Sequence, residues 1–176
     1  MELLIGKRQK FNVVCDEWLE YKKMRIKEST YANYKLKITN YLKKDFGERN
    51  LREIANINLN RYVEELQFKL SSKTVKDTIT VLKSILKYAE RKYNMDFKLD
   101  LVSTPITTTK EAEVFNERER KKMEEYILDS DSIRDLGILI SMYTGLRIGE
   151  VCALKWSDID FESKKIRIRH TVQRIY

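Results

Sequence analysis

Apolar residues recur at the three- and four-residue spacing of an α-helix along most of this chain. In the first hundred residues the spacing predicts four helices, at about 11–24, 30–46, 58–70 and 72–93. We expect Ser29 and Asn58 to cap the second and third helices and the fourth to begin at Ser72, while Gly47 is a stop signal after the second. Each helix has one apolar face, which favours a helical bundle around a shared core.

Two of these helices carry polar faces that are basic and rich in amides or hydroxyls. On the helix at 30–46 this face holds Asn33, Lys37, Asn40 and Lys44. On the helix at 72–93 it holds Lys73, Lys76, Thr80, Lys83, Ser84, Lys87 and Arg91. Cations interleaved with hydroxyls are suited to a phosphate backbone, because charges release counterions and hydroxyls give directional hydrogen bonds. One such face alone is equally typical of a solvated surface, and the two together favour contact with DNA or RNA.

The distribution of charge supports the same interpretation. The chain has 176 residues and a net charge of +8. Residues 1–105 hold 22 Lys and Arg against 14 Asp and Glu, whereas residues 106–176 hold 13 against 13. The excess therefore lies entirely in the N-terminal part, which indicates a polyanion-binding module joined to a nearly neutral one. Nucleic acid is favoured over a membrane surface, because the basic helices also carry Asn, Thr and Ser.

The helical spacing breaks after residue 93, in a stretch that contains Pro105, the one proline of the sequence. The predicted organisation is an N-terminal tail at 1–10, a helical domain at 11–97, a linker at 98–112 and a second domain at 113–176. Asn116 and Glu119 have the spacing of a capping box, which predicts a helix to about residue 128. A further helix at 131–143 is apolar nearly all round and is expected to be buried, and a strand is expected over 165–175.

Composition excludes several classes of protein. No apolar run approaches the roughly 18 residues that a membrane span needs, and the N-terminus lacks a signal-peptide core, so a cytoplasmic location is expected. Cys15 and Cys152 lie far apart without paired spacing, which argues against a disulfide framework or a zinc site. Both cysteines are expected to be small buried hydrophobes.

Candidate chemistry gathers after the turn at Thr144 and Gly145. Arg147 follows this turn at the start of a short predicted helix, between the apolar residues Leu146 and Ile148. A guanidinium in apolar surroundings is costly unless it is paired or used, and its planar fork suits two-pronged binding of a phosphate or carboxylate. Glu150, three residues later, could orient it. The alternative is a purely structural pair between the two side chains.

The segment TGLRIGEVCALKWSDIDF resembles the first catalytic motif of the tyrosine recombinase (phage integrase) family. Three preceding segments, FNVVCDEWLEYKK, KESTYANYKLKITNYLKKDFGERNLREI and SSKTVKDTITVLKSILKYAERKY, resemble the core-binding domain of that family. The pattern is most like integrases of phages and conjugative transposons. The resemblance implies a mainly α fold: a SAM-like four-helix bundle joined to the helical start of an α+β catalytic domain, with a small β hairpin or sheet at the C-terminal end.

The resemblance also implies roles for individual residues. Arg147 corresponds to an arginine that neutralises the phosphate in the transition state of DNA cleavage, while Glu150 and Asp160 correspond to acidic residues that support it. Asp158 is the alternative to Asp160. The family uses a tyrosine that forms a covalent 3'-phosphotyrosine, and it needs no metal or other cofactor. The implied partners are duplex DNA at attachment or core-type sites and other recombinase protomers, with no membrane.

The sequence also departs from the family pattern. His170 and Arg174 are four residues apart rather than three, so His170 is interpreted as a surface or strand histidine. Tyr176 lacks the context of the nucleophile, and neither Lys164 nor Lys165 is assigned as the catalytic lysine. We therefore expect the first part of a truncated catalytic domain, inactive alone, with apolar surface and an open strand edge left around Ile166 and Ile168.

Two other functions remain open at this point. A non-catalytic helical DNA-binding regulator derived from an integrase would keep the helical module and use the region around Arg147 for packing. An RNA-binding helical protein is less favoured, because the chain contains no RNA-recognition motif.

Overall fold

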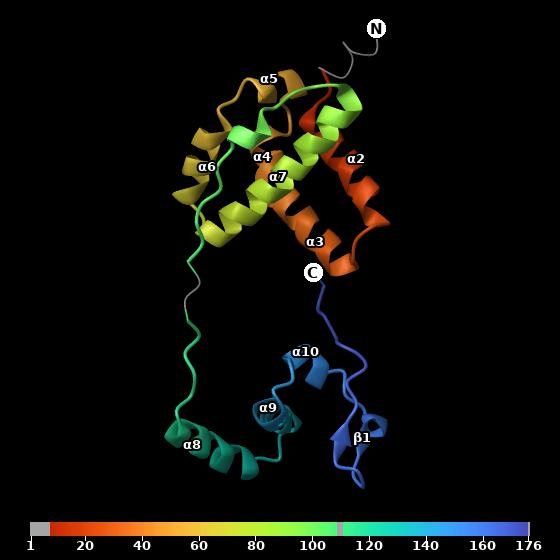
Figure 1. Ribbon diagram of the computed structural model, residues 1–176, viewed down its shortest axis with the longest axis vertical. Helices are drawn as coiled ribbons and strands as arrows, with labels where there is room; N and C mark the ends of the chain where they lie inside the picture. Colours follow the sequence, from red (N-terminus) through yellow and green to blue (C-terminus); the bar gives the residue numbers. More distant parts are fainter. Residues whose placement is uncertain (1–7, 109–110, 176) are drawn as a thin grey trace. The chain divides into compact units, whose positions relative to one another are not determined.

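The computed structural model describes residues 8–108 and 111–175. The chain divides into two compact units: the second comprises residues 110–174, and the first comprises the remaining residues (Figure 1). Both units are mainly helical, and a two-stranded antiparallel sheet lies in the second. The mainly α class with a small C-terminal hairpin is thus confirmed. No helix in the described ranges is long and apolar enough to cross a membrane.

The helices of the first unit follow the predicted order. They are α2 (Phe11–Lys23), α3 (Glu28–Lys37), the π-helical turn η1 (Ile38–Leu42), α4 (Lys43–Phe46), α5 (Leu51–Ala55), α6 (Leu59–Gln67), α7 (Ser72–Tyr93) and the 3-10 turn η2 (Leu99–Leu101). The helix predicted at 72–93 has the predicted bounds. Asn58 caps α6 as expected, because its side chain accepts hydrogen bonds from the backbone N–H groups of Asn60 and Arg61.

The start of the second predicted helix differs from expectation, whereas its end agrees with it. Ser29 is not its cap: it lies inside α3, and Lys27 occupies the cap position with an extended backbone. The carbonyl of Lys27 already accepts hydrogen bonds from the N–H groups of Thr30 and Tyr31, so the first turn begins earlier than the serine suggested. The helix ends at Phe46 and Gly47 is its cap, as predicted, although the backbone angles of Gly47 are right-handed. A Cβ atom there would collide with the side chain of Asn12 and the carbonyl of Lys43, which explains the glycine.

A single core lies between the helices of the first unit. Its largest fully buried side chains include Phe11, Trp18, Ile38, Leu42, Ile79, Leu82 and Leu86. The long helix α7 packs against α2, α3, η1 and α6 and supplies the predicted apolar face (Figure 1). Phe97 and Val102, from the segment that follows α7, close the core with 5% and 8% of their surface exposed. The first residues of the expected linker are therefore packed against this unit.

The short helix α5 was not predicted, although the sequence contains a signal for it. The Asn50 side chain accepts a hydrogen bond from the Glu53 backbone N–H, and the Glu53 carboxylate accepts one from the Asn50 N–H. This reciprocal pair is a capping box, which satisfies two backbone donors at the start of the helix. Leu51 and Ile54 of α5 are buried in the core.

The second unit contains α8 (Glu117–Leu128), α9 (Ile133–Thr144), α10 (Ile148–Val151), the 3-10 turn η3 (Trp156–Asp158) and the strands β1 (Ile159–Asp160) and β2 (Lys165–Ile166). The strands pair antiparallel with Ile159 opposite Ile166. Asn116 and Glu119 form the predicted capping box. Gly145 ends α9 with a φ of +70°, a conformation in which a Cβ atom would be strained.

Three expectations for this unit are wrong. The helix at 131–143 is not buried: Ile133 is 84% exposed, and none of the residues of α9 is buried. Its main packing partners in the described chain are the short α10 and one side of α8, which leave much of its surface uncovered. The strand expected over 165–175 is limited to Lys165–Ile166, because β1 offers two residues for pairing. Cys152 is exposed, whereas Cys15 is buried as expected. The predicted apolar surface is present, and it includes Ile166 and Ile168.

Candidate functional site

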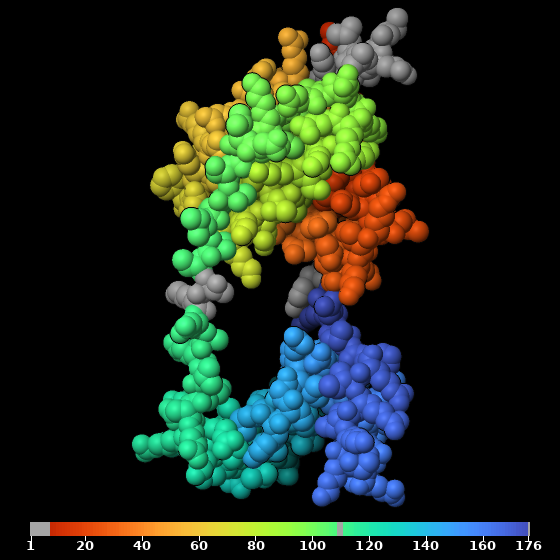
Figure 2. Space-filling model, viewed as in Figure 1, coloured from red at the N-terminus to blue at the C-terminus, as the bar shows by residue number. Residues whose placement is uncertain are grey.

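The polar face of α7 forms a strip along the surface of the first unit. Its residues, which we call the α7 strip, are Lys73, Lys76, Thr80, Lys83, Ser84, Lys87 and Arg91. In Figure 2, side chains of α7, coloured yellow-green, make up much of the visible face of this unit. Lys73, Lys76, Lys87 and Arg91 are exposed, and none of these four cations forms an ion pair with a described residue. Their charge is available to a partner.

Lys83 and Thr80 differ from their neighbours on the strip. Lys83 is half-buried, and its Nζ donates a hydrogen bond of 2.6 Å to the backbone carbonyl of Val102. The Thr80 hydroxyl donates to the Lys76 carbonyl at 2.8 Å, one turn earlier on the same helix. An ammonium group has three donors and a hydroxyl can also accept, so both retain capacity for a further hydrogen bond.

The face predicted on the second helix is not uniform in the structure. Asn33, Asn40 and Lys44 are exposed, but Lys37 is 16% exposed in its side chain and lies 3.8 Å from the carboxylate of Asp77 on α7. Lys44 instead lines a hollow shared with α6. The π-helical turn η1 lies between Lys37 and Lys44 and adds a residue to one turn, so the even spacing assumed from sequence does not hold.

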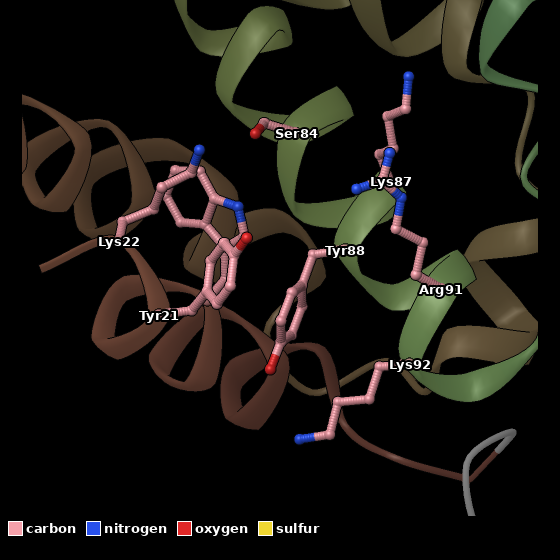
Figure 3. Close-up of a pocket in the computed structure, with 8 residues that line it drawn as sticks. Tyr21, Lys22, Ser84, Lys87, Tyr88, Arg91 and Lys92 are labelled. Atoms are coloured by element: carbon pink, nitrogen blue, oxygen red, sulfur yellow. The ribbon is translucent and has the colours of Figure 1, made fainter. Parts of the chain in front are cut away.

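A groove between α2 and α7 adds residues that the sequence did not indicate (Figure 3). Ser84, Lys87 and Arg91 of the α7 strip line one side, and Tyr21 and Lys22 of α2 line the other. Trp18 lies in the same lining and is 1% exposed. Trp18 and Lys22 are four residues apart and so share a helix face, but sequence alone did not show that this face borders the basic side of α7.

In the second unit, Arg147 and Glu150 lie together as expected. Arg147 occupies the cap position of α10, and its backbone N–H donates to the Glu150 carboxylate at 2.9 Å. The guanidinium is 3.6 Å from the other oxygen of the same carboxylate. The Arg147 side chain is 87% exposed, and the Glu150 side chain is 22% exposed. The apolar burial predicted around Arg147 is not observed, because Ile148 is 71% exposed. The guanidinium is paired with Glu150 on one side but largely exposed, so it keeps N–H donors for an anion.

Asp160 lies on β1 and has other partners than Arg147. Its carboxylate accepts a hydrogen bond of 2.9 Å from the Ser163 backbone N–H, and hydrogen bonds from Ser163 lower the pKa of Asp160. Asp158 is the buried carboxylate of this region, with 6% exposed. It accepts from the Lys155 N–H at 3.1 Å and lies 3.7 Å from Arg169. The structure therefore gives Asp158 a role in holding the turn before β1.

Other residues discussed from sequence are found on the surface. His170 is exposed and lies outside any strand, which agrees with a surface histidine. Lys164 has a φ of +53° in the turn between the strands, and Lys165 is exposed on β2. Tyr176 lies outside the described residues. Within the described ranges, no group of three or more His, Cys, Asp or Glu side chains could hold a metal ion.

Comparison with known proteins connects both units to one family. Residues 10–67 match the family described as "Phage integrase, N-terminal SAM-like domain", and residues 107–175 match the "Phage integrase family". The chain is 29% identical to an integrase of Staphylococcus phage L54a, over 94% of this chain and 52% of the relative. It is 32% identical to a tyrosine recombinase XerC-like protein of Caldanaerobacter subterraneus subsp. tengcongensis, over 90% of this chain and 42% of the relative.

A solved structure shares the fold. It is the Tn1549 transposon integrase (residues 82–397) in complex with circular intermediate DNA, with a TM-score of 0.64 and 20% identity over 90% of this chain and 54% of that one. The chain spans about half the length of the curated relatives it matches. The two family matches follow each other in the expected order and between them cover most of the sequence, so the chain belongs to the phage integrase family.

Proposed function

We propose that this chain is the DNA-binding portion of a site-specific tyrosine recombinase, and that the α7 strip contacts the phosphate backbone of duplex DNA. The observation that carries the proposal is a set of four cations on one helix that form no ion pair with a described residue: Lys73 and Lys76 near its start, and Lys87 and Arg91 near its end. Asn33, Asn40 and Lys44 are candidates for further contacts, and Lys37 is available only if it leaves Asp77. Lysines on phosphates position a protein without reading bases, so sequence preference from this strip is expected to be modest.

The test is the dependence of DNA affinity on salt. Removal of one phosphate contact should reduce the slope of log affinity against log salt concentration by about 0.9. Lys76→Gln and Lys87→Gln should each lower the slope, while Arg52→Gln, which removes an exposed charge from α5, should not. Binding whose strength is independent of salt would contradict the proposal. Competition between duplex DNA and RNA of equal length distinguishes DNA binding from the RNA-binding alternative.

We further infer that Arg147 takes the scissile phosphate in the recombinase. Its guanidinium is largely exposed. Glu150 accepts a hydrogen bond from the backbone N–H of Arg147 at 2.9 Å and lies 3.6 Å from one nitrogen of the guanidinium, so the side chain is oriented and still keeps exposed N–H donors. A positive group beside the non-bridging oxygens of the phosphate stabilises the negative charge that develops on them during phosphoryl transfer. The covalent 3'-phosphotyrosine step belongs to a tyrosine in the sequence context typical of the family, which we do not assign to Tyr176. The roles of Glu150 and Asp160 as supporting residues remain proposals.

Arg147→Lys separates this role from a structural one. Lysine keeps the charge but loses the two-pronged fork. In a recombinase that contains this chain together with a nucleophilic tyrosine, the substitution should reduce phosphotyrosine formation on a nicked substrate by roughly 10² to 10³. The melting temperature should stay close to that of the parent. A lowered melting temperature with normal cleavage would instead support a purely structural role for Arg147 as the partner of Glu150. The expected cytoplasmic location and the assembly with further protomers likewise remain proposals.

A further inference from the structure

The groove between α2 and α7 is lined by positive and aromatic side chains without a carboxylate. Its volume is about 360 Å³, and its lining comprises Trp18, Tyr21, Lys22, Ser84, Lys87, Tyr88, Arg91 and Lys92. The residues of each helix are spaced by three and four, so they form one face of α2 and one face of α7. Four of the eight are cations, and the groove is therefore suited to an anion.

Three of the four cations in this groove are free to bind an anion. Lys92 is 2.9 Å from the carboxylate of Glu17, which neutralises it in part and raises the pKa of the ammonium group. Lys22, Lys87 and Arg91 form no ion pair with a described residue. The groove thus carries a surplus of positive charge that the fold itself does not use.

Aromatic rings line the groove beside two of its cations, Lys22 and Lys92. The rings of Tyr21 and Tyr88 are 5.5 Å apart between centroids and tilted by 40°. Lys22 lies 5.5 Å from the ring centre of Trp18, and Lys92 lies 5.7 Å from that of Tyr88. Figure 3 shows the two tyrosine rings next to each other, with Lys22 beside Tyr21 and Lys92 beside Tyr88. Cation–π contacts of this kind attract an ammonium group to the face of the ring and help to hold it in place.

The groove is continuous with the α7 strip, because Ser84, Lys87 and Arg91 belong to both. A polyanion that follows the strip from Lys76 towards the C-terminal end of α7 therefore reaches the groove. We propose that the groove seats the phosphate backbone of the DNA strand at this end of the strip, and that Lys22 makes a phosphate contact from α2. This inference rests on the proposed DNA binding and adds a second helix to the interface.

The neighbouring Lys23 provides a matched control for Lys22. Lys23 carries the same charge on the same helix, does not line the groove, and lies 3.8 Å from Glu20. In the 176-residue chain, binding of a fluorescein-labelled duplex of fixed length would be measured by anisotropy at several salt concentrations. Lys22→Gln should lower the salt slope by about 0.9, and Lys23→Gln should leave it unchanged. Lys22→Arg, which keeps the charge, should restore the parent slope.

Including Lys76→Gln separates failure of this inference from failure of the proposed function. Lys76 lies on the strip but outside the groove. If Lys76→Gln lowers the slope and Lys22→Gln does not, the groove has no role in DNA binding and the proposed function stands. Equal effects of Lys22→Gln and Lys23→Gln would also overturn the inference, because they would reflect net charge alone. If none of the variants changes the slope, both proposals fail. Thermal unfolding of each variant shows whether it is folded.

Discussion

The ammonium group of Lys83 donates a hydrogen bond of 2.6 Å to the backbone carbonyl of Val102, 19 residues later in the chain. Asn60 on α6 holds the same stretch at two further points: its amide donates to the Leu101 carbonyl at 2.9 Å and its oxygen accepts from the Ser103 N–H at 2.8 Å. We call residues 97–103 the strap. Side chains of two helices thus satisfy three backbone groups near the end of the strap: the carbonyls of Leu101 and Val102 and the N–H of Ser103.

We expect Asn60→Ala to loosen the end of the strap without unfolding the first unit. The substitution removes two hydrogen bonds, each of which contributes about 0.5 to 1.5 kcal/mol. Amide hydrogen exchange at Ser103 should become faster, while exchange in the middle of α7 should stay unchanged. The matched variant Asn60→Asp keeps the acceptor for the Ser103 N–H and loses the donor to Leu101. Equal exchange at Ser103 in the parent and Asn60→Ala chains would contradict this role for Asn60.

The two cysteines should differ sharply in reactivity. Burial raises the pKa of Cys15 to about 12, because it disfavours the thiolate, and the thiolate is the reactive form. Cys152 is exposed. At pH 8 an alkylating reagent should therefore modify one cysteine per folded chain, Cys152, and both in denaturant. Peptide mass spectrometry identifies the modified residue, and rapid modification of Cys15 in the folded chain would show that the core around it opens.

Equivalent truncations in the two units should have very different costs. Ile79 on α7 is fully buried, so Ile79→Ala should destabilise the first unit by about 2 to 5 kcal/mol. Ile133 on α9 is 84% exposed, so Ile133→Ala should change stability by no more than about 0.5 kcal/mol. Denaturant unfolding measures both. A large cost at Ile133 would mean that α9 is covered in solution, for example by a second copy of the chain.

The stability of the turn at Asp160 should decrease as the solution becomes acidic. Hydrogen bonds from Ser163 lower the pKa of this carboxyl from its ordinary value of 3.8, so its contribution is complete above that value and is lost as the pH falls through the lowered pKa. Asp160→Asn cannot titrate and keeps an acceptor for the Ser163 N–H. The parent should therefore melt at a higher temperature than Asp160→Asn at pH 6, and the difference should vanish in strong acid. A difference that is constant with pH would contradict this account.

Sequence predicted best those features that depend on neighbours close along the chain. The period of apolar residues located α7 from Ser72 to Tyr93, and the capping spacing located the start of α8 at Asn116. The same spacing occurs at Asn50 and Glu53, where it marks the start of the unpredicted α5. Likewise, the three-residue separation of Arg147 and Glu150 predicted their pairing correctly.

Features that depend on distant residues were not predictable in this way. The burial of α9 was overestimated because an apolar helix becomes buried only if other elements cover it. Helical spacing also assumed regular turns, and η1 breaks that assumption between Lys37 and Lys44. The groove at Lys22 depends on α2 packing beside α7, and the partner of Lys83 lies beyond the end of its helix.

The strap also determines where the connection between the two units can change in length. Phe97 and Val102 anchor it in the core, and the Ser103 N–H, which donates to the Asn60 side chain, is its last hydrogen-bonded amide. A glycine-serine peptide inserted between Thr104 and Pro105 would add length to exposed chain and leave these anchors in place. The same peptide inserted between Asp100 and Leu101 would shift Val102 away from Lys83 and expose the core. The permissive boundary for fusions and spacer variants of this protein therefore begins at Thr104.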